Sequence, residues 1–142
     1  MNLKIIIDPN TQTVENNCKI CFGTIYIGDD FAETITPALD YWTVEDYKKQ
    51  WQKGLEQIKT YDKSCLVASI QNPDIAPYLN WWVLYKENKT IYIYNQQFIG
   101  NDVKKLLKNK NFTVSSCYDF IQPKEIITPD DGYNYSEWKI DL

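Results

Sequence analysis

The longest periodic pattern in the chain is a stripe of apolar residues spaced three or four positions apart, as on one face of an α-helix. The stripe consists of Val44, Tyr47, Trp51, Leu55 and Ile58. Thr43 precedes it, with the carboxylate of Asp46 three residues later, an arrangement typical of a capping box at a helix start. Gly54 lies inside the pattern, where it costs about 1 kcal/mol relative to alanine. We therefore expect a helix from Thr43 to Ile58 whose Gly54 packs closely against a neighbouring element.

The other apolar runs are short, rich in β-branched and aromatic residues, and bounded by turn signals, which is typical of β-strands. We expect strands at residues 3–7, 18–27, 64–70, 81–85, 90–94, 112–118 and 135–140. Turns are predicted at Asp8-Pro9-Asn10 and Pro129-Asp130-Asp131-Gly132, and residues 86–89 would connect a hairpin. A short second helix, capped by Asn101 or Asp102, is predicted to run to Leu107.

This order of elements predicts an α+β fold in which a mainly antiparallel sheet packs against one long and one short helix. At 142 residues, of which 44% are apolar, the chain has the size of one well-buried domain, and we expect residues 1–142 to form it. The N-terminal apolar stretch is too short for a signal peptide, and no run approaches the length of a membrane span. We therefore expect a cytoplasmic protein without a membrane partner.

Residue types that catalysis commonly needs are missing from the sequence. The chain has no His, and its 15 cationic residues are all Lys. Without His there is no imidazole to activate a nucleophile or to bind a metal. Without Arg there is no bidentate clamp for phosphate. Because Lys, Tyr and paired carboxylates remain, a small enzyme stays as the least favoured alternative, and we predict no catalytic residue and no cofactor.

Two further patterns suit metal binding, but each has a simpler interpretation. Cys18 and Cys21 form a C-x-x-C motif, yet Cys65 and Cys117 are isolated, so the sequence does not assemble a zinc site. A thioredoxin-type motif would begin a helix, whereas these residues lie in an expected strand. The adjacent carboxylates at positions 29–30, 45–46 and 130–131 lie in turns or a first helical turn, where acids are common. We therefore expect buried thiols, solvated acids and no metal site.

Charge is distributed unevenly along the chain. The net charge is −4 and the pI about 4.8, which argues against a nucleic-acid partner. Residues 1–46 contain two Lys and eight acidic residues, residues 47–124 twelve Lys and six acidic residues, and residues 125–142 one Lys and five acidic residues. If both acidic ends fold onto one face, they would attract a cationic partner. The alternative is a solvated surface.

Blocks of aromatic and acidic residues follow one another in a distinctive order. They are Ile27-Gly28-Asp29-Asp30-Phe31 with Glu33, Leu39-Asp40-Tyr41-Trp42, Asp46-Tyr47, Gln50-Trp51 with Leu55, Trp81-Trp82 with Leu84-Tyr85, Ile91-Tyr92-Ile93, and Ser136-Glu137-Trp138. In order and spacing, from about residue 22 to residue 140, they resemble the immunity proteins of bacterial contact-dependent growth inhibition (CdiI-type) systems. The resemblance implies a cytoplasmic antidote that binds the C-terminal toxin domain of a large exported protein, one to one, and protects the producing cell.

Many toxins of such systems are nucleases, so the resemblance also implies an acidic inhibitor that covers a positive substrate groove or binds beside it. We expect the toxin to contact four acidic residues near the N-terminus, joined by two near the C-terminus. These residues are Asp29, Asp30, Glu33, Asp40, Asp130 and Asp131. Because Asp29 and Glu33 match the family pattern, they could instead stabilise a turn. A generic acidic adaptor or regulatory domain remains the main alternative, and a deep pocket with convergent polar groups would favour an enzyme.

Overall fold

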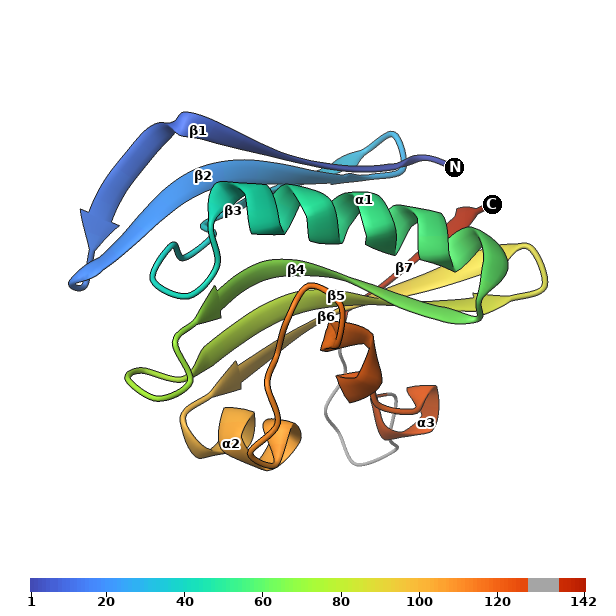
Figure 1. Ribbon diagram of the computed structural model, residues 1–142. Helices are drawn as coiled ribbons and strands as arrows, with labels where there is room; N and C mark the ends of the chain where they lie inside the picture. Colours follow the sequence, from blue (N-terminus) through green and yellow to red (C-terminus); the bar gives the residue numbers. More distant parts are fainter. Residues whose placement is uncertain (128–135) are drawn as a thin grey trace.

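Alternating apolar residues in the N-terminal third form a three-stranded antiparallel sheet, called sheet A, with the strand order β1-β2-β3. Its strands are β1 (Leu3–Glu15), β2 (Cys18–Ile27) and β3 (Phe31–Ile35). The computed structural model describes residues 1–127 and 136–142 and places this sheet over a second antiparallel sheet (Figure 1). Sheet B has the order β4-β5-β6-β7. Its strands are β4 (Lys63–Gln71), β5 (Tyr78–Glu87), β6 (Thr90–Ile99) and β7 (Glu137–Asp141).

The predicted long helix is confirmed as α1 (Val44–Thr60). It begins with the expected capping box, in which the Thr43 hydroxyl accepts from the Asp46 N–H at 3.2 Å and the Asp46 carboxylate accepts from the Thr43 N–H at 2.9 Å. The helix lies between the two sheets along one side of the molecule (Figure 1). In the described part of the chain, no helix is long and apolar enough to cross a membrane.

Side chains of α1 occupy the position that a further strand would take beside β4. The Gln50 side-chain oxygen accepts from the Val67 N–H at 2.7 Å, and the Trp51 indole donates to the Val67 carbonyl at 2.8 Å. The Tyr47 hydroxyl accepts from the Ile70 N–H at 3.0 Å. Because an exposed sheet edge offers unpaired backbone groups to other chains, these bonds close the β4 edge of sheet B.

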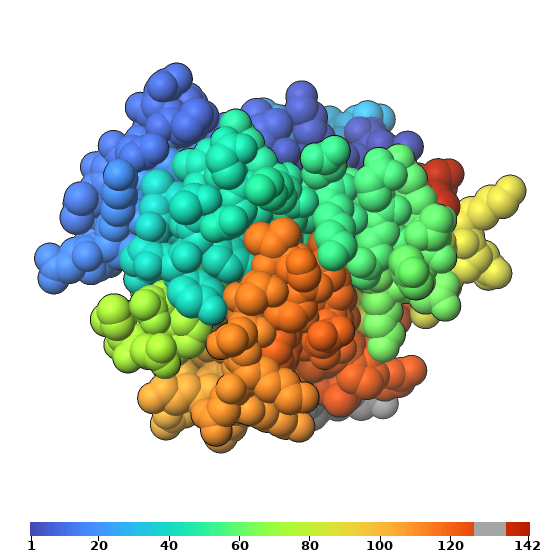
Figure 2. Space-filling view, in the orientation of Figure 1, coloured from blue at the N-terminus to red at the C-terminus, as the bar shows by residue number. Residues whose placement is uncertain are grey.

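Both faces of sheet B are covered, because successive residues of a strand point to opposite faces. Trp82 of β5 faces sheet A, where its ring lies 6.1 Å from that of Phe31. Trp81 faces the other way, and its ring lies 5.7 Å from Phe112. The covering segment on that side holds α2 (Asn101–Leu107), the 3-10 helix η1 (Cys117–Phe120) and α3 (Lys124–Ile127). Figure 2 shows part of this segment beside α1.

The prediction that Asp8-Pro9-Asn10 ends the first strand was wrong. The local turn does form, since the Asp8 carboxylate accepts from the Asn10 N–H at 3.0 Å. The strand continues beyond it, however, and pairing with β2 resumes at Thr13 after a shift in register. The turn residues therefore produce a β-bulge inside a long hairpin, because the pairing on both sides is strong enough to absorb them.

The antiparallel strands form two sheets. Three other details differ from the sequence-based expectation. Strand β3 was missed, and residues 112–118 form turns and the start of η1 in place of a strand. There, the Thr113 and Ser116 side chains hydrogen-bond each other's backbone N–H groups at 3.0 Å, which favours a turn. The second helix is preceded by Gly100 and has no side-chain cap. The turn predicted at residues 129–132 lies outside the described residues.

Candidate functional site

The structure brings acidic residues from both ends of the chain to one side of the molecule. The ring of Phe31, the first residue of β3, lies 4.7 Å from that of Trp138 in β7. Strand β3 follows the acidic turn of Asp29 and Asp30, and β7 contains exposed acids of its own. Figure 1 shows both chain termini at the same end of the molecule as the turn between β2 and β3. Asp29, Asp30, Glu33, Glu137 and Asp141 are all exposed and are together called the acidic side. The Glu137 and Asp141 side chains lie on the face of β7 opposite to Trp138.

Within this set, Asp29 also has a structural role. Its carboxylate accepts a hydrogen bond from the Asn2 side chain at 2.7 Å, while the Gly28 N–H donates to the Asn2 carbonyl at 2.9 Å. Gly28 has a φ of 65°, a conformation that glycine adopts without the steric cost paid by other residues. These contacts attach the N-terminus to the turn, so the expectation that Asp29 could stabilise a turn agrees with the geometry.

Asp30 and Glu33 are better placed to meet a partner. Neither carboxylate forms a hydrogen bond or ion pair with another of the described residues. Glu33 lies on the same face of β3 as Phe31 and Ile35, which pack into the core, yet its own side chain is exposed. An inward-pointing charge on an edge strand discourages non-specific pairing with other chains. Both carboxylates therefore remain hydrated until something displaces the water.

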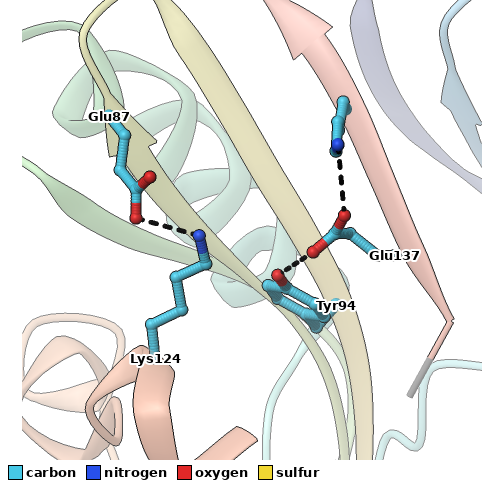
Figure 3. Close-up of polar contacts among 5 residues, drawn as sticks. Glu87, Tyr94, Lys124 and Glu137 are labelled. Atoms are coloured by element: carbon cyan, nitrogen blue, oxygen red, sulfur yellow. Dashed lines mark hydrogen bonds and ion pairs between the residues drawn. The ribbon is translucent and has the colours of Figure 1, made fainter. Parts of the chain in front are cut away.

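Glu137 belongs to a hydrogen-bond network on the face of sheet B that points away from sheet A (Figure 3). The Tyr94 hydroxyl donates to its carboxylate, and Lys139 lies 3.7 Å from it. Burial, and then the hydrogen bond to Glu137, raises the pKa of Tyr94 well above its ordinary value, so this phenol stays protonated and continues to donate. Lys124 forms a separate ion pair with Glu87 at 2.9 Å (Figure 3). Lys139 offsets part of the negative charge of Glu137 at this end of the acidic side.

The remaining predicted acids do not join the others. The Asp40 carboxylate accepts from the Asn72 N–H at 3.3 Å, and the nearby Ala38 pairs with Ile20 near the start of β2. Asp29, in contrast, follows the end of that strand. The seven residue steps from Ile20 to Ile27 span roughly 23 Å at the usual rise of a strand, so Asp40 lies far from the acidic turn. Asp130 and Asp131 lie outside the described residues.

Sequence reasoning missed Glu137 and Asp141 as members of the acidic side. The signal was present as an excess of acids in residues 125–142. Only the packing of Trp138 on Phe31 shows that β7 lies next to β3, and a contact between separate sheets leaves no periodic signal in the sequence.

Exposed lysines lie on another part of the surface. The outward side of α1 carries Lys48, Lys49, Lys53 and Lys59, and two of them form ion pairs within the helix, Lys48 with Glu45 and Lys59 with Glu56. Since α1 closes the β4 edge and β7 is the opposite edge of sheet B, these lysines and the acidic side are separated across three strand spacings, roughly 14 Å. Because α1 also contains three acids, its net charge is only slightly positive, and the contrast between the two sides arises mainly from the carboxylates of the acidic side.

The C-x-x-C motif lies on a strand, as expected, and all four thiols are buried. Residues three apart on a strand point to opposite faces, so the Cys18 and Cys21 side chains diverge. Burial, followed by nearby carboxylates, raises the pKa of both thiols. This is the reverse of the lowered pKa that makes a redox cysteine reactive.

We therefore predict slow alkylation of Cys18 and Cys21 in the folded chain. At pH 8, iodoacetamide should modify them at least about tenfold more slowly than free cysteine, because little thiolate forms and access is limited. Peptide mapping by mass spectrometry gives the rate at each site, and the same reaction in urea provides the control. Rapid modification of either thiol without denaturant would contradict the structural interpretation.

A hollow between α1 and η1 contains a tyrosine whose pKa is shifted. One hollow lies between the C-terminal half of α1 and η1, and its lining includes Lys53, Asp62, Tyr118 and Asp119. The pKa of Tyr118 is raised, chiefly by burial, and its hydroxyl lies 3.1 Å from the Gln50 amide nitrogen, which donates to it. Tyr118 thus connects η1 to α1, which is a structural role.

Comparisons with known proteins place the chain in a specific context. The family model described as "CdiI N-terminal domain" matches residues 37–142. The "Immunity protein CdiI" of Enterobacter cloacae subsp. cloacae is 32% identical over 116 residues, which are 80% of this chain and 74% of that protein. A solved "CdiA-CT/CdiI toxin and immunity complex" from Enterobacter cloacae matches with a TM-score of 0.77 and 26% identity, over 100% of this chain and 91% of the compared chain.

Proposed function

Since the chain belongs to the CdiI family of immunity proteins, we propose that it binds and neutralises the toxin domain of a contact-dependent growth inhibition effector. The observation that supports this most directly is the fold shared with a protein solved in complex with its toxin. An inhibitor of this kind needs high affinity and a fast association rate, and it needs no catalytic groups. The absence of His and Arg from the sequence is consistent with such a role.

The toxin is proposed to be a nuclease, and the acidic side supplies the physical reason. A nuclease groove must carry positive charge to hold the phosphate backbone. Carboxylates such as Asp30 and Glu33, exposed and without partners among the described residues, offer that groove a substitute for phosphate. Because nucleic acid is inside the cell, the inhibitor would act in the cytoplasm, in a one-to-one complex with the toxin.

The proposed function is tested with the polypeptide encoded by the C-terminal region of the adjacent effector gene. Calorimetry should show one-to-one binding with a nanomolar or lower dissociation constant. Coexpression of this chain should rescue cells that produce the polypeptide. Degradation of RNA or DNA by the polypeptide, and its arrest by one equivalent of this chain, would establish the nuclease part separately. A folded, toxic polypeptide that does not bind would favour the generic adaptor interpretation.

Charge reversal at Asp30 is expected to slow association with the toxin. At low salt, Asp30→Lys should reduce the association rate roughly three- to tenfold and flatten its dependence on ionic strength, because part of the attractive field is removed. Stopped-flow fluorescence at several salt concentrations measures both effects. Asp30 is a cleaner choice than Asp29, whose replacement would also break the bond to Asn2.

Asp74→Lys provides the matched control, since it makes the same change of charge in the loop between β4 and β5, at the other end of the molecule (Figure 1). Its association rate should stay within about twofold of the wild-type value. Asp40→Lys should also have a small effect if the acidic side carries the attraction. Equal slowing by all three variants would show that net charge matters and the position of the acids does not.

A further inference from the structure

The outer face of sheet A is a sheet face that no described element covers. Residues paired in the register lie on the same face, and this face contains Ile6, Phe22, Thr24, Tyr26, Ala32 and Thr34. The opposite face packs into the core, where Ile25 and Ile27 are buried. In Figure 1, α1 and sheet B lie on only one side of sheet A.

The composition of this face differs from that of an ordinary solvated sheet. Exposed faces of antiparallel sheets are usually polar or charged, whereas this face carries two charged side chains, Lys4 opposite Tyr26 and Asp8 opposite Phe22, among apolar residues and threonines. Ile6 is 43% exposed and Tyr26 is 39% exposed, although both are large and apolar. Single exposed apolar residues need no explanation, whereas contiguous ones mark binding surfaces. Ile6 pairs with Thr24, two residues from Tyr26 in β2, so the two side chains lie close together.

A hollow next to these side chains gives the face the shape of a docking surface. It is lined by Ile6, Phe22, Thr24 and Thr34, together with Thr11 near the β1 bulge. The bulge interrupts the pairing of β1 with β2 between Asp8 and Thr13. At the centre of an interface, an exposed aromatic side chain often inserts into a pocket of the partner, and a depression beside it can receive a side chain of the partner.

Two observations indicate which partner the face receives. The acidic turn follows Tyr26 by three residues, so Asp29 and Asp30 border one end of the face and would oppose a cationic partner. In addition, sheet A precedes residue 37, where the match to the family model begins. The solved toxin and immunity complex nevertheless matches over 100% of this chain, so sheet A belongs to the fold shared with a protein that binds a toxin.

We propose that the outer face of sheet A is the surface on which the cognate toxin domain docks, with Ile6 and Tyr26 at its apolar centre and Asp29 and Asp30 at its acidic rim. This inference rests on the proposed function and adds to it the location of the binding surface and separate roles for its rim and its centre. The rim accelerates encounter, and the apolar centre slows dissociation, because burial of apolar surface contributes most where water is fully excluded.

The first test measures toxin binding by Tyr26→Ala and Ile6→Ser. Each variant should dissociate roughly tenfold faster, with an association rate and salt dependence close to those of the wild-type chain. Tyr61→Ala and Ile99→Ser are the matched controls, because these residues are exposed by 65% and 64% and lie outside sheet A; both should bind as the wild-type chain does. Urea unfolding of every variant checks that the fold is retained.

The second test needs no variant and therefore does not depend on folding. Lys4 lies on the same face, with its ammonium 6.0 Å from the Tyr26 ring centre. Its acetylation by an N-hydroxysuccinimide ester should slow at least about fivefold in the complex, while acetylation of Lys49 on α1 should not change. Normal dissociation of both variants and unprotected Lys4, in a chain that binds toxin, would overturn this inference alone. Absence of binding by the wild-type chain would overturn the proposed function and this inference with it.

Discussion

Replacing Trp51 with alanine is expected to lower the free energy of unfolding by about 3–5 kcal/mol, the usual cost of removing a large buried aromatic side chain. Trp51 is only 3% exposed, and its ring lies 6.0 Å from that of Tyr47. Its indole N–H also donates to the Val67 carbonyl at 2.8 Å. Truncation would leave both a cavity between α1 and the sheets and an unpaired acceptor on β4. Urea titration followed by far-ultraviolet circular dichroism measures the change.

Two companion variants separate the causes. Trp51→Phe keeps most of the ring but removes the hydrogen bond, so it should cost less, about 1–2 kcal/mol. Gln52→Ala, at the exposed neighbouring position of α1, should change stability by no more than about 0.5 kcal/mol. Wild-type stability in Trp51→Ala would show that this stripe of α1 is not part of the core. A single cooperative transition in all three variants would also support the expectation that residues 1–142 form one domain.

The importance of Trp51 arises from the way α1 closes sheet B. A sheet edge offers backbone groups to any strand that approaches it. On β4 these groups bond instead to side chains of α1, as with Gln50 and the Val67 N–H. At the opposite edge, β7 has only five residues and lies beside β3. The acidic side thus lies away from the edge that α1 closes, which limits the orientations in which a cationic partner can approach.

The elements that were predicted correctly are those whose buried residues form either a helical stripe or a continuous apolar run. Helix α1 could be predicted because its apolar stripe and its Thr43 capping box agree with each other. The hairpin of β5 and β6 was predicted from two continuous apolar runs, Trp81–Tyr85 and Ile91–Tyr94, which suit strands covered on both faces. Strand β3 was missed because it has five residues, among them Ala32 and Glu33, which favour strands weakly. Its pairing with β2 stabilises it, and that contact is not visible in the local sequence.

The candidate site was predictable only in part for a similar reason. Asp29 and Asp30 were expected in a turn because the glycine before them signals a chain reversal, and the structure places both in the turn between β2 and β3. Asp40 was grouped with them only because it is near in sequence, and β2 separates the two positions. Glu137 could not be placed, because its neighbourhood depends on the packing of β7 beside β3. Charge totals indicate which segments are acidic, whereas topology decides which of them meet.

Substitution of Gly54 by alanine is expected to destabilise the chain by about 2–3 kcal/mol, near the upper end of the usual cost of overpacking. In an exposed helix the same change would gain up to about 1 kcal/mol. Here an added Cβ would lie 2.3 Å from the Cys65 carbonyl oxygen and 3.1 Å from the Leu66 side chain. The first contact is with backbone, so it cannot be relieved by rotating a side chain. The sequence-based expectation that Gly54 marks close packing is thus confirmed.

Relief of that clash requires α1 to move away from β4, and the consequences extend beyond the contact itself. The added Cβ would also lie 3.2 Å from the Gln50 amide nitrogen, which donates to the same Cys65 carbonyl at 2.8 Å. The bond from the Val67 N–H to Gln50 should therefore weaken, and hydrogen exchange at Val67 should accelerate more than at residues of β6. Gln52→Ala, on the exposed side of α1, provides the control and should leave exchange at Val67 unchanged. If Gly54→Ala proved as stable as the wild-type chain, α1 would not lie as close to β4 as the structure places it, and the closed edge would need another explanation.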